Sequence, residues 1–226
     1  FGIASVAILL ALAVPVLDLD TGMPSIKVVP KDDPSRVGYV AVQDAFGTGA
    51  PGALQVVVPE AQADRATQVL GDDDAIERVM PPQPGRDGYV LLQAIPSTDP
   101  SDPALGDSID RLRRELPASA MLGGAVAENH DLEAELGSAT PKVIGVVLVL
   151  GFALLLVALQ APLIAALGVL TNLLAVAAAF GVGSLVFQHG HLEGLLGFES
   201  QGFLNAWAPV FFFAMIFAIS MDYTVF

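Results

Sequence analysis

The separation of charged from apolar residues constrains this 226-residue chain more than any other feature. All ten Lys and Arg residues lie between Lys27 and Lys142, whereas only Glu193, Glu199 and Asp222 are charged after Lys142. An uncharged run of about 20 apolar residues is long enough to cross a bilayer as a helix. The pattern therefore predicts a protein of the membrane in which one polar module lies between membrane segments.

The polar module is acidic. Of the 24 acids in the chain, three follow Lys142, so 21 acids stand against ten bases between Asp18 and Lys142, a net charge of −11. An acidic surface repels phosphates, which disfavours a nucleic-acid partner. The solubility of an exposed domain explains the charge. Because the chain has no Cys, a disulfide framework, a Cys-based metal site and a thiol nucleophile are all excluded.

Four apolar segments are predicted to belong to the membrane. They are expected at residues 1–15 and at about 141–159, 163–187 and 205–226. The first is shorter than a full span and is interpreted as the end of a truncated membrane helix. A tight break at Gln160-Ala161-Pro162 separates the second from the third. The last segment stops at Phe226 with no polar exit, so the chain is interpreted as a fragment cut inside a membrane helix.

Residues 16–139 form the polar module, and a repeat of element types is predicted within it. A first helix begins at the Asp33-Pro34 pair and runs to about Phe46. Strands and helices then alternate in the order βαββαβ, a split βαβ of the ferredoxin-like α+β type. The strands are expected at 53–58, 76–80, 88–95 and 120–123, and the helices at 61–70 and 102–116. A polar helix over 125–137 would lead to the membrane.

Asp222, followed at once by Tyr223, is the main candidate for function. If Trp207 lies at a membrane interface, the 15 residues to Asp222 place the acid roughly 22 Å into the bilayer at about 1.5 Å per residue. Acids at that depth are costly and mark ion paths or proton relays. A protonated form becomes accessible in a low dielectric, and Tyr223 can donate to the carboxylate or accept from the acid. The alternative is that Asp222 reaches the cytosolic headgroups.

Other polar residues support weaker hypotheses. Asn172 either lines a path or, as the sequence favours, hydrogen-bonds a neighbouring helix. His130, among four acids, is a surface residue by default, with a pH sensor or metal ligand as alternatives. His189-x-His191 is interpreted as part of a membrane-surface loop rather than a metal site. No metal site or cofactor is predicted. Three arginines form a solvated face rather than a binding patch, balanced by acids at helical spacing: Arg111, Arg113 and Arg114 with Asp107, Asp110 and Glu115.

These residues together resemble a known family. The order of one membrane helix, a large outer domain and three clustered helices resembles the second half of the MMPL (mycobacterial membrane protein large) transporters, a branch of the resistance-nodulation-division (RND) superfamily. The strongest match is the string from Ser220 through Asp222-Tyr223 to Val225-Phe226. Further matches are Gln160–Leu163 with Asn172–Leu174, Leu196–Phe198, Trp207–Phe211, Gly123-Gly124 and Asn129–Asp131.

The resemblance implies a twelve-helix, RND-type membrane bundle of two repeated halves, each with an extracytoplasmic porter domain of ferredoxin-like topology. Residues 1–15 would end the seventh helix, 16–139 would form the second porter domain, and 140–226 would hold helices eight to ten. The implied activity is proton-driven export of lipids or other hydrophobic molecules. Asp222 and Tyr223 match the family's proton relay. Independently of the resemblance, Ser220 and Asn172 are candidate supporting polar residues. A partner Asp-Tyr pair would lie in the first-half repeat, which this chain lacks.

The predicted location is the cell membrane, with several spans and residues 16–139 outside. Both ends of the module meet the same membrane face, and acidic connectors poor in Lys and Arg fit the outside. The alternative function is a non-transporting sensor or binding protein with a sterol-sensing-like bundle. An enzyme is not expected, because no nucleophile–base or metal spacing stands out. The cargo and the oligomeric state, monomer or homo-oligomer, stay open at this point.

Overall fold

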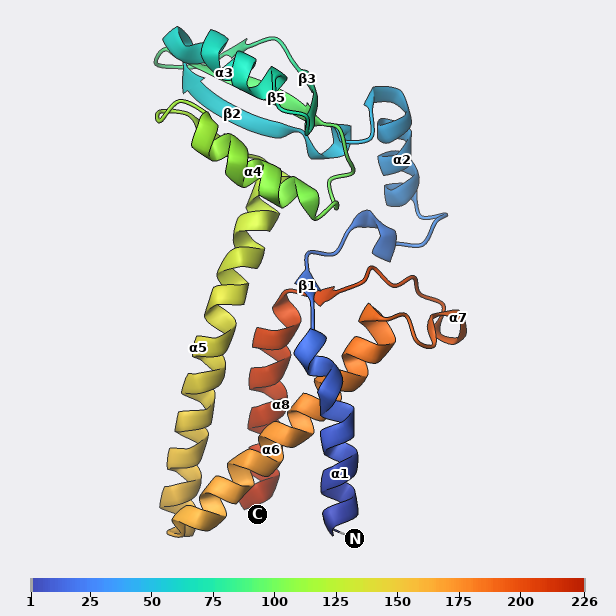
Figure 1. The fold of residues 1–226 in the computed structure, drawn as a ribbon, viewed down its shortest axis with the longest axis vertical. Coiled ribbons are helices and arrows are strands. Elements are labelled where there is room, and N and C mark those ends of the chain that lie inside the picture. The colour runs from blue at the N-terminus through green and yellow to red at the C-terminus, as the bar shows by residue number, and fades with distance from the viewer. Residues whose placement is uncertain (1, 226) are drawn as a thin grey trace. The chain divides into compact units, whose positions relative to one another are not determined.

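The computed structural model describes the backbone of residues 2–225 and the side chains of residues 2–221. The chain divides into two compact units (Figure 1). One is built from residues 1–22 and 133–226, and the other from residues 23–132. Helix α5 (Ala125–Leu159) contributes residues to both units.

Residues 23–132 form an α+β unit around an antiparallel sheet. Four strands lie in the order β3-β5-β2-β6, and a short strand β4 pairs with β5. The element order is the one predicted from the sequence, with β4 added to it. The bounds are β2 Leu54–Pro59, α3 Ala63–Gly71, β3 Ile76–Val79, β4 Gln83–Pro84, β5 Tyr89–Pro96, α4 Ala104–Glu115 and β6 Met121–Gly123.

One face of this sheet holds the core of the unit. Leu54, Val56 and Val58 alternate along β2 and are fully buried, whereas Gln55 between them is exposed, as the two-residue period of a strand requires. Residues of β5 that pair with them are buried on the same face. Helices α3 and α4 supply the other half of this core, through Leu70, Leu105, Ile109 and Leu112. Both helices therefore cover the same face of the sheet.

Helix α2 (Pro34–Phe46) precedes the sheet and begins as predicted, with the Asp33 carboxylate accepting a hydrogen bond from the Ser35 N–H at 2.8 Å. It buries none of its residues. Its polar anchor is Asp99, which accepts from the Gln43 side chain at 2.9 Å and from the Tyr39 hydroxyl. Burial, together with that carboxylate, raises the pKa of Tyr39 to about 12. Three short 3-10 helices complete the unit: η2 Ile26–Val28, η3 Ala50–Gly52 and η4 Glu60–Gln62.

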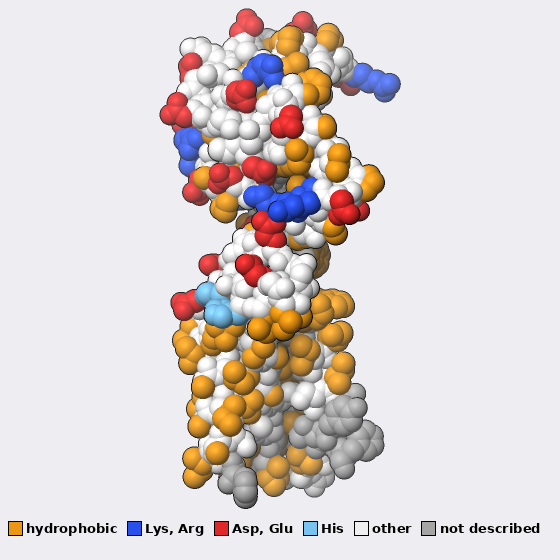
Figure 2. Space-filling model, turned by 90° about the vertical axis from the view of Figure 1, so that its right-hand side faces the viewer, with side chains coloured by type: hydrophobic (Ala, Val, Ile, Leu, Met, Phe, Trp, Pro, Cys, Tyr) orange, Lys and Arg blue, Asp and Glu red, His pale blue; other side chains and the backbone are white. Residues whose placement is uncertain are grey.

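The second unit is helical and apolar. Its elements are α1 Gly2–Ala13, the 3-10 helix η1 Val14–Asp18, α5, α6 Pro162–Gly183, the π-helix η5 Ser184–Gln188, α7 Glu193–Leu196 and α8 Trp207–Val225. Within the described residues, α5 and the α6–η5 helix are long and apolar enough to cross a membrane, while α1 with η1 and the described part of α8 are shorter apolar helices. Orange side chains cover the surface of these helices in Figure 2, which suits contact with lipid.

Helix α6 packs against both α1 and α8. The segment after η1 and the segment before α8 are joined by a parallel pair of two-residue strands, β1 (Thr21–Gly22) and β7 (Leu204–Asn205). The predicted break is present: α5 ends at Leu159, and Gln160 adopts a left-handed conformation with φ 51° before Pro162 begins α6.

The structure corrects one predicted boundary. The sequence suggested a polar helix over 125–137 and a separate membrane helix from about 141, but these are one continuous 35-residue helix that passes through Pro141. The change from polar to apolar side chains marks a change of surroundings, not an end of the backbone helix. Beyond α1, the chain also continues as a 3-10 helix to Asp18 instead of leaving its helical path at Pro15.

Candidate functional site

Asp222 and Tyr223 lie on the last turns of α8, but their side chains fall outside the part that the structure describes. The described turns just before them are closely packed. Phe213, Phe217 and Met221, at helical spacing, are 4%, 1% and 9% exposed. The rings of Phe213 and Phe217 stack with centroids 5.5 Å apart. One stripe of α8 before the Asp-Tyr pair is thus buried, whereas Met215 and Ile219 on the same turns are exposed.

Two neighbouring helices hold this segment of α8. Gly151 of α5 lies so close that a Cβ there would be 2.7 Å from the Met221 Sδ and 2.9 Å from the Phe217 ring. On the other helix, Val169 and Val176 of α6 join the same buried cluster. The glycine permits this approach because it has no side chain. Ser220, on the same turn of α8, is partly buried.

Asn172 is a buried polar residue on α6, with 5% of its surface exposed. Its Nδ2 donates a hydrogen bond of 3.2 Å to the backbone carbonyl of Phe217. This is the bond to a neighbouring helix that the sequence favoured. Within the described part of the chain, the Asn172 Oδ1 is buried without a hydrogen-bond partner. The NH₂ group of the amide is therefore hydrogen-bonded, whereas its oxygen is not.

A polar cluster at the end of the α6–η5 helix was missed by the sequence analysis. The Gln188 side chain donates to the Asp18 carbonyl at 2.8 Å and accepts from the Asp20 N–H at 3.1 Å. Ser200 donates to the carbonyls of Phe187 and Gln188, each at 2.8 Å. A single glutamine in a connector carries no signal for partners 168 or more positions away. Gln188 thus joins the end of the α6–η5 helix to the segment that follows η1.

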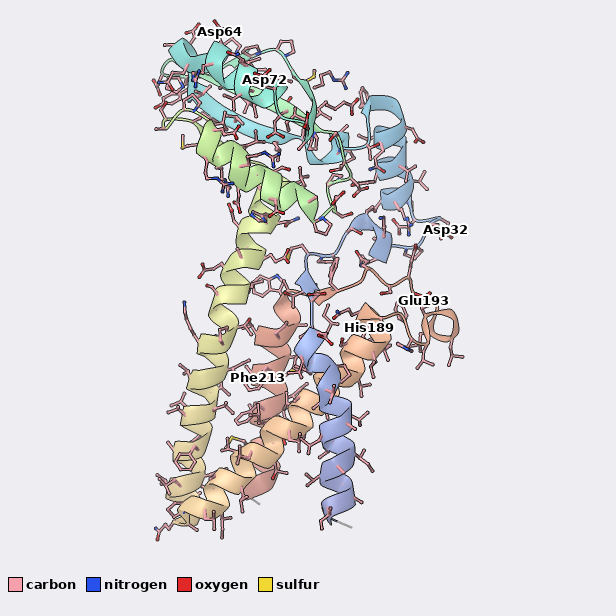
Figure 3. The ribbon with its side chains drawn as sticks, in the orientation of Figure 1. Asp32, Asp64, Asp72, His189, Glu193 and Phe213 are labelled. Carbon is pink, nitrogen blue, oxygen red and sulfur yellow. The ribbon has the colours of Figure 1, made fainter. Side chains whose placement is uncertain are left out.

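His189 and His191 belong to the same connector, where Figure 3 shows His189 and Glu193. Each imidazole Nδ1 lies within hydrogen-bond distance of a backbone carbonyl of η5, at 3.2 Å from Ser184 and 2.8 Å from Leu185. Both histidines thus contact carbonyls at the end of the helix. Among the described residues, no group of three or more His, Asp or Glu side chains could hold a metal ion.

An apolar cavity of about 400 Å³ lies in the helical unit. Its walls come from η1, α5, α6 and α8, and they include Val16, Leu19, Ile144, Val176, Phe180 and Phe213. Thr21 and Thr140 are polar residues of its lining. A space with these walls accepts an apolar group.

The arginines of α4 have partners that the sequence did not predict. Arg111 binds Asp73 with two hydrogen bonds, of 2.8 and 2.9 Å, and Arg113 binds Asp131 in the same paired manner, one of its bonds measuring 2.7 Å. The expected balance by acids at helical spacing was therefore wrong about the closest partners. Hydrogen bonds from Arg111 hold the pKa of Asp73 below its usual value, against the effect of burial. Those from Arg113 likewise lower the pKa of Asp131.

His130 is less exposed than the surface residue expected from the sequence, with 27% of its side chain accessible. Its Nε2 lies 3.3 Å from the Asp110 Oδ1, and its ring lies against Gly106, where a Cβ would be only 2.6 Å from Nδ1. Together with the Arg113–Asp131 pair, this contact fastens the start of α5 to α4.

The helices and the polar unit define a membrane protein that carries an exposed α+β domain. The chain belongs to the MMPL family, which it matches over residues 51–226. It is 34% identical, over 99% of its length, to the mycolic acid-containing lipids exporter MmpL11 of Mycolicibacterium smegmatis, and covers 25% of that protein. It is 32% identical to the heme uptake protein MmpL11 of Mycobacterium tuberculosis, again over 99% of this chain and 25% of that protein.

A relative from outside the mycobacteria is the membrane protein YdfJ of Bacillus subtilis. It is 28% identical over 99% of this chain, which covers 33% of YdfJ. The chain thus spans about a quarter of the length of the MmpL11 relatives and a third of YdfJ. These matches support the resemblance found in the sequence, at the level of the family.

Proposed function

We propose that this chain is part of a transporter that exports lipids or other hydrophobic molecules across the cytoplasmic membrane, driven by the proton gradient. The observation that carries the proposal is the Asp222-Tyr223 pair on α8, an apolar helix whose stripe of Phe213, Phe217 and Met221 is buried against α5 and α6. An ionisable residue in such a helix is a functional residue by default. The names of the two MmpL11 relatives, for lipid export and heme uptake, both point to hydrophobic cargo.

In this proposal the parts take the roles that the family resemblance implies. The α+β unit is a ferredoxin-like porter domain, within residues 16–139, on the outer side of the membrane. Residues 1–15 end the seventh family helix, and residues 140–226 supply the eighth to tenth. A second Asp-Tyr pair in another repeat completes the relay. The apolar cavity between η1, α5, α6 and α8 supports cargo with an apolar body.

The proposed mechanism needs one proton to change the packing of one helix. When Asp222 takes up a proton, its charge disappears and α8 can adopt a second arrangement against its neighbours. Tyr223 supplies a hydroxyl that can donate to the carboxylate or accept from the acid. A non-transporting sensor is not favoured, because the MmpL11 relatives carry names of exporters and uptake proteins.

The test is to replace Asp222 by Asn in the full-length protein. Asn nearly matches Asp in shape and keeps polar contacts, but it cannot carry a proton, so we expect export to be abolished at an unchanged membrane level. Tyr223→Phe removes one hydroxyl and should impair export less. The measurement is cargo efflux from proteoliposomes under an imposed proton gradient.

The matched control is Asp18→Asn, which neutralises an exposed acid at the end of η1 and should leave efflux unchanged. Full export by the Asp222→Asn variant would exclude a proton-relay role for this residue. The stability of each variant in detergent separates loss of transport from loss of folding.

A further inference from the structure

The unpaired oxygen of Asn172 is the polar atom from which the inference starts. The amide is buried, its Nδ2 donates to the Phe217 carbonyl at 3.2 Å, and its Oδ1 has no partner among the described residues. Reversing the amide would set two oxygens against each other, so the hydrogen bond fixes which half faces α8. A buried acceptor left unpaired is costly, and such groups in native structures need an explanation.

Asn172 meets α8 about one turn before the relay pair. Its hydrogen-bond acceptor is the backbone carbonyl of Phe217, five residues before Asp222, which is a rise of about 7.5 Å along the helix. The carbonyl oxygen itself covers roughly 2 Å of that rise. The Asn172 amide therefore meets α8 about 5 Å before Asp222 along the helix axis.

Contacts with α5 also prevent α8 from shifting freely. Gly151 of α5 touches both Met221 and Phe217, so the turn that Asn172 binds is also held by α5. Movement of α8 along or about its axis must then break the Asn172–Phe217 bond or displace the closely packed Gly151 contact. The Asn172 amide is consequently placed to sense the position of the turn that precedes the Asp-Tyr pair.

We propose that Asn172 is a positioning residue of the relay and an acceptor for its proton-loaded state. Its N–H holds the Phe217 turn of α8, and its free oxygen accepts a hydrogen bond from an O–H group that is present when the relay carries a proton. That O–H belongs either to the protonated carboxyl of Asp222 or to a water molecule that delivers the proton. The inference rests on the proposed function, because it assigns a residue to the same proton path.

The test compares Asn172→Leu with the neighbouring Thr171→Val in the full-length transporter. Leu keeps the branched shape of Asn, with the same number of side-chain heavy atoms, but removes both donor and acceptor. Thr171 is exposed on the same helix, and its hydroxyl donates to the Leu167 carbonyl of that helix at 2.7 Å. The readout is the rate of proton-driven cargo efflux as a function of pH, normalised to protein in the membrane.

We expect Asn172→Leu to lower the efflux rate about tenfold and to move the pH midpoint of efflux by about one unit to lower pH. The shift has this sign because an acceptor for O–H stabilises the proton-loaded state, and its loss requires more acid to load the relay. Thr171→Val should leave both the efflux rate and the pH midpoint unchanged. A residue that only fills space would change the rate without moving the pH midpoint.

A second variant keeps the test decisive if the Leu protein is poorly inserted. In Asn172→Asp, the neutral acid keeps one donor and one acceptor, whereas the ionised form loses the donor. Its efflux should approach that of the unmodified protein at low pH and fall more steeply as the pH rises. A wild-type pH profile in either variant would overturn the inference.

Asp222→Asn, measured in parallel, separates the two proposals. If it abolishes efflux while the Asn172 variants behave as wild type, the relay stands and the role of Asn172 is wrong. If Asp222→Asn transports normally, the proposed function itself fails.

Discussion

Asp73 is a buried charged side chain, with only 3% of it exposed, and it is also the anchor of the longest-range ion pair on α4. Its Oδ1 accepts from both Arg111 and the Ala75 N–H, so it fixes the turn before β3 while it binds α4. Arg111 is 41% exposed and keeps access to water. Of the two side chains, Asp73 is therefore the one whose charge depends more on its protein partners.

Replacing Asp73 by Ala should lower the unfolding free energy of the α+β unit by about 2 kcal/mol, because it removes hydrogen bonds in a buried place. Asp72→Ala, an exposed neighbour, should change it by less than about 0.5 kcal/mol. Hydrogen exchange of the β2 and β5 amides measures both. Equal effects at the two positions would contradict this ranking.

The contribution of Asp73 to the stability of the α+β unit depends on pH. Because the pKa of Asp73 is lower in the folded chain than its ordinary value, its contribution is fully present above that ordinary value and is lost as the pH falls through the folded value. We expect the stability difference between the unmodified chain and Asp73→Ala to shrink in strong acid and to be constant near neutral pH.

The sequence could single out Asp222, Tyr223 and Asn172, because a polar residue in an apolar run is visible without coordinates. It could not find Asp73 with Arg111, or Gln188 with Asp18 and Asp20, because these partners lie 38 to 170 positions apart. Their side chains look like ordinary surface residues until the fold brings them together.

At the scale of elements, strands and helices were predictable where composition and period agree. The β-branched run of β2 and the Asp33 cap of α2 are local signals that the structure bears out. Continuity was harder, since a proline and a change of polarity at residues 140–142 indicated an interruption in α5 that is absent. Close packing between helices depends on single glycines, whose contacts cannot be read from the sequence.

Gly181 is the sharpest of these glycine contacts. A Cβ there would collide with the Leu12 carbonyl oxygen and lie 3.3 Å from the Ala13 Cα, because α1 crosses α6 backbone to backbone. Gly181→Ala should therefore force α1 away and cost about 1–3 kcal/mol. Gly183→Ala, where the added Cβ would be 3.8 Å from Leu204, is the control. Thermal melting in detergent should rank the Gly181 variant clearly below the Gly183 variant, and identical melting would argue against the α1–α6 contact.

For the whole molecule, the distribution of charge predicts which parts face water. The bases and most acids lie between Asp18 and Lys142, while apolar side chains are exposed on the helices of the other unit, as on Leu154, Val157 and Leu163. The family match covers both kinds of segment. Which side of the membrane each loop occupies is part of the proposed function and can be measured directly.

These 226 residues contain no Cys, so a single Cys introduced here into a full-length protein freed of any other Cys can be labelled selectively. Asp64→Cys, on the exposed surface of α3 (Figure 3), should react with a membrane-impermeant maleimide in intact cells. Ala161→Cys, in the turn between α5 and α6, should react only after permeabilisation. Labelling of Ala161→Cys from outside would reverse the proposed orientation.

The pairing of β1 with β7 has a consequence for the order in which the protein assembles. Residues 21–22 meet residues 204–205, and Gln188 reaches back to Asp18 and Asp20. The α+β unit, by contrast, draws its core from a continuous segment of chain. During synthesis that unit has all its strands long before β7 exists, and chains fold as their units become complete. The β1–β7 pairing therefore forms after the core of the α+β unit, so the segment after α1 must wait for a partner made more than 160 residues later.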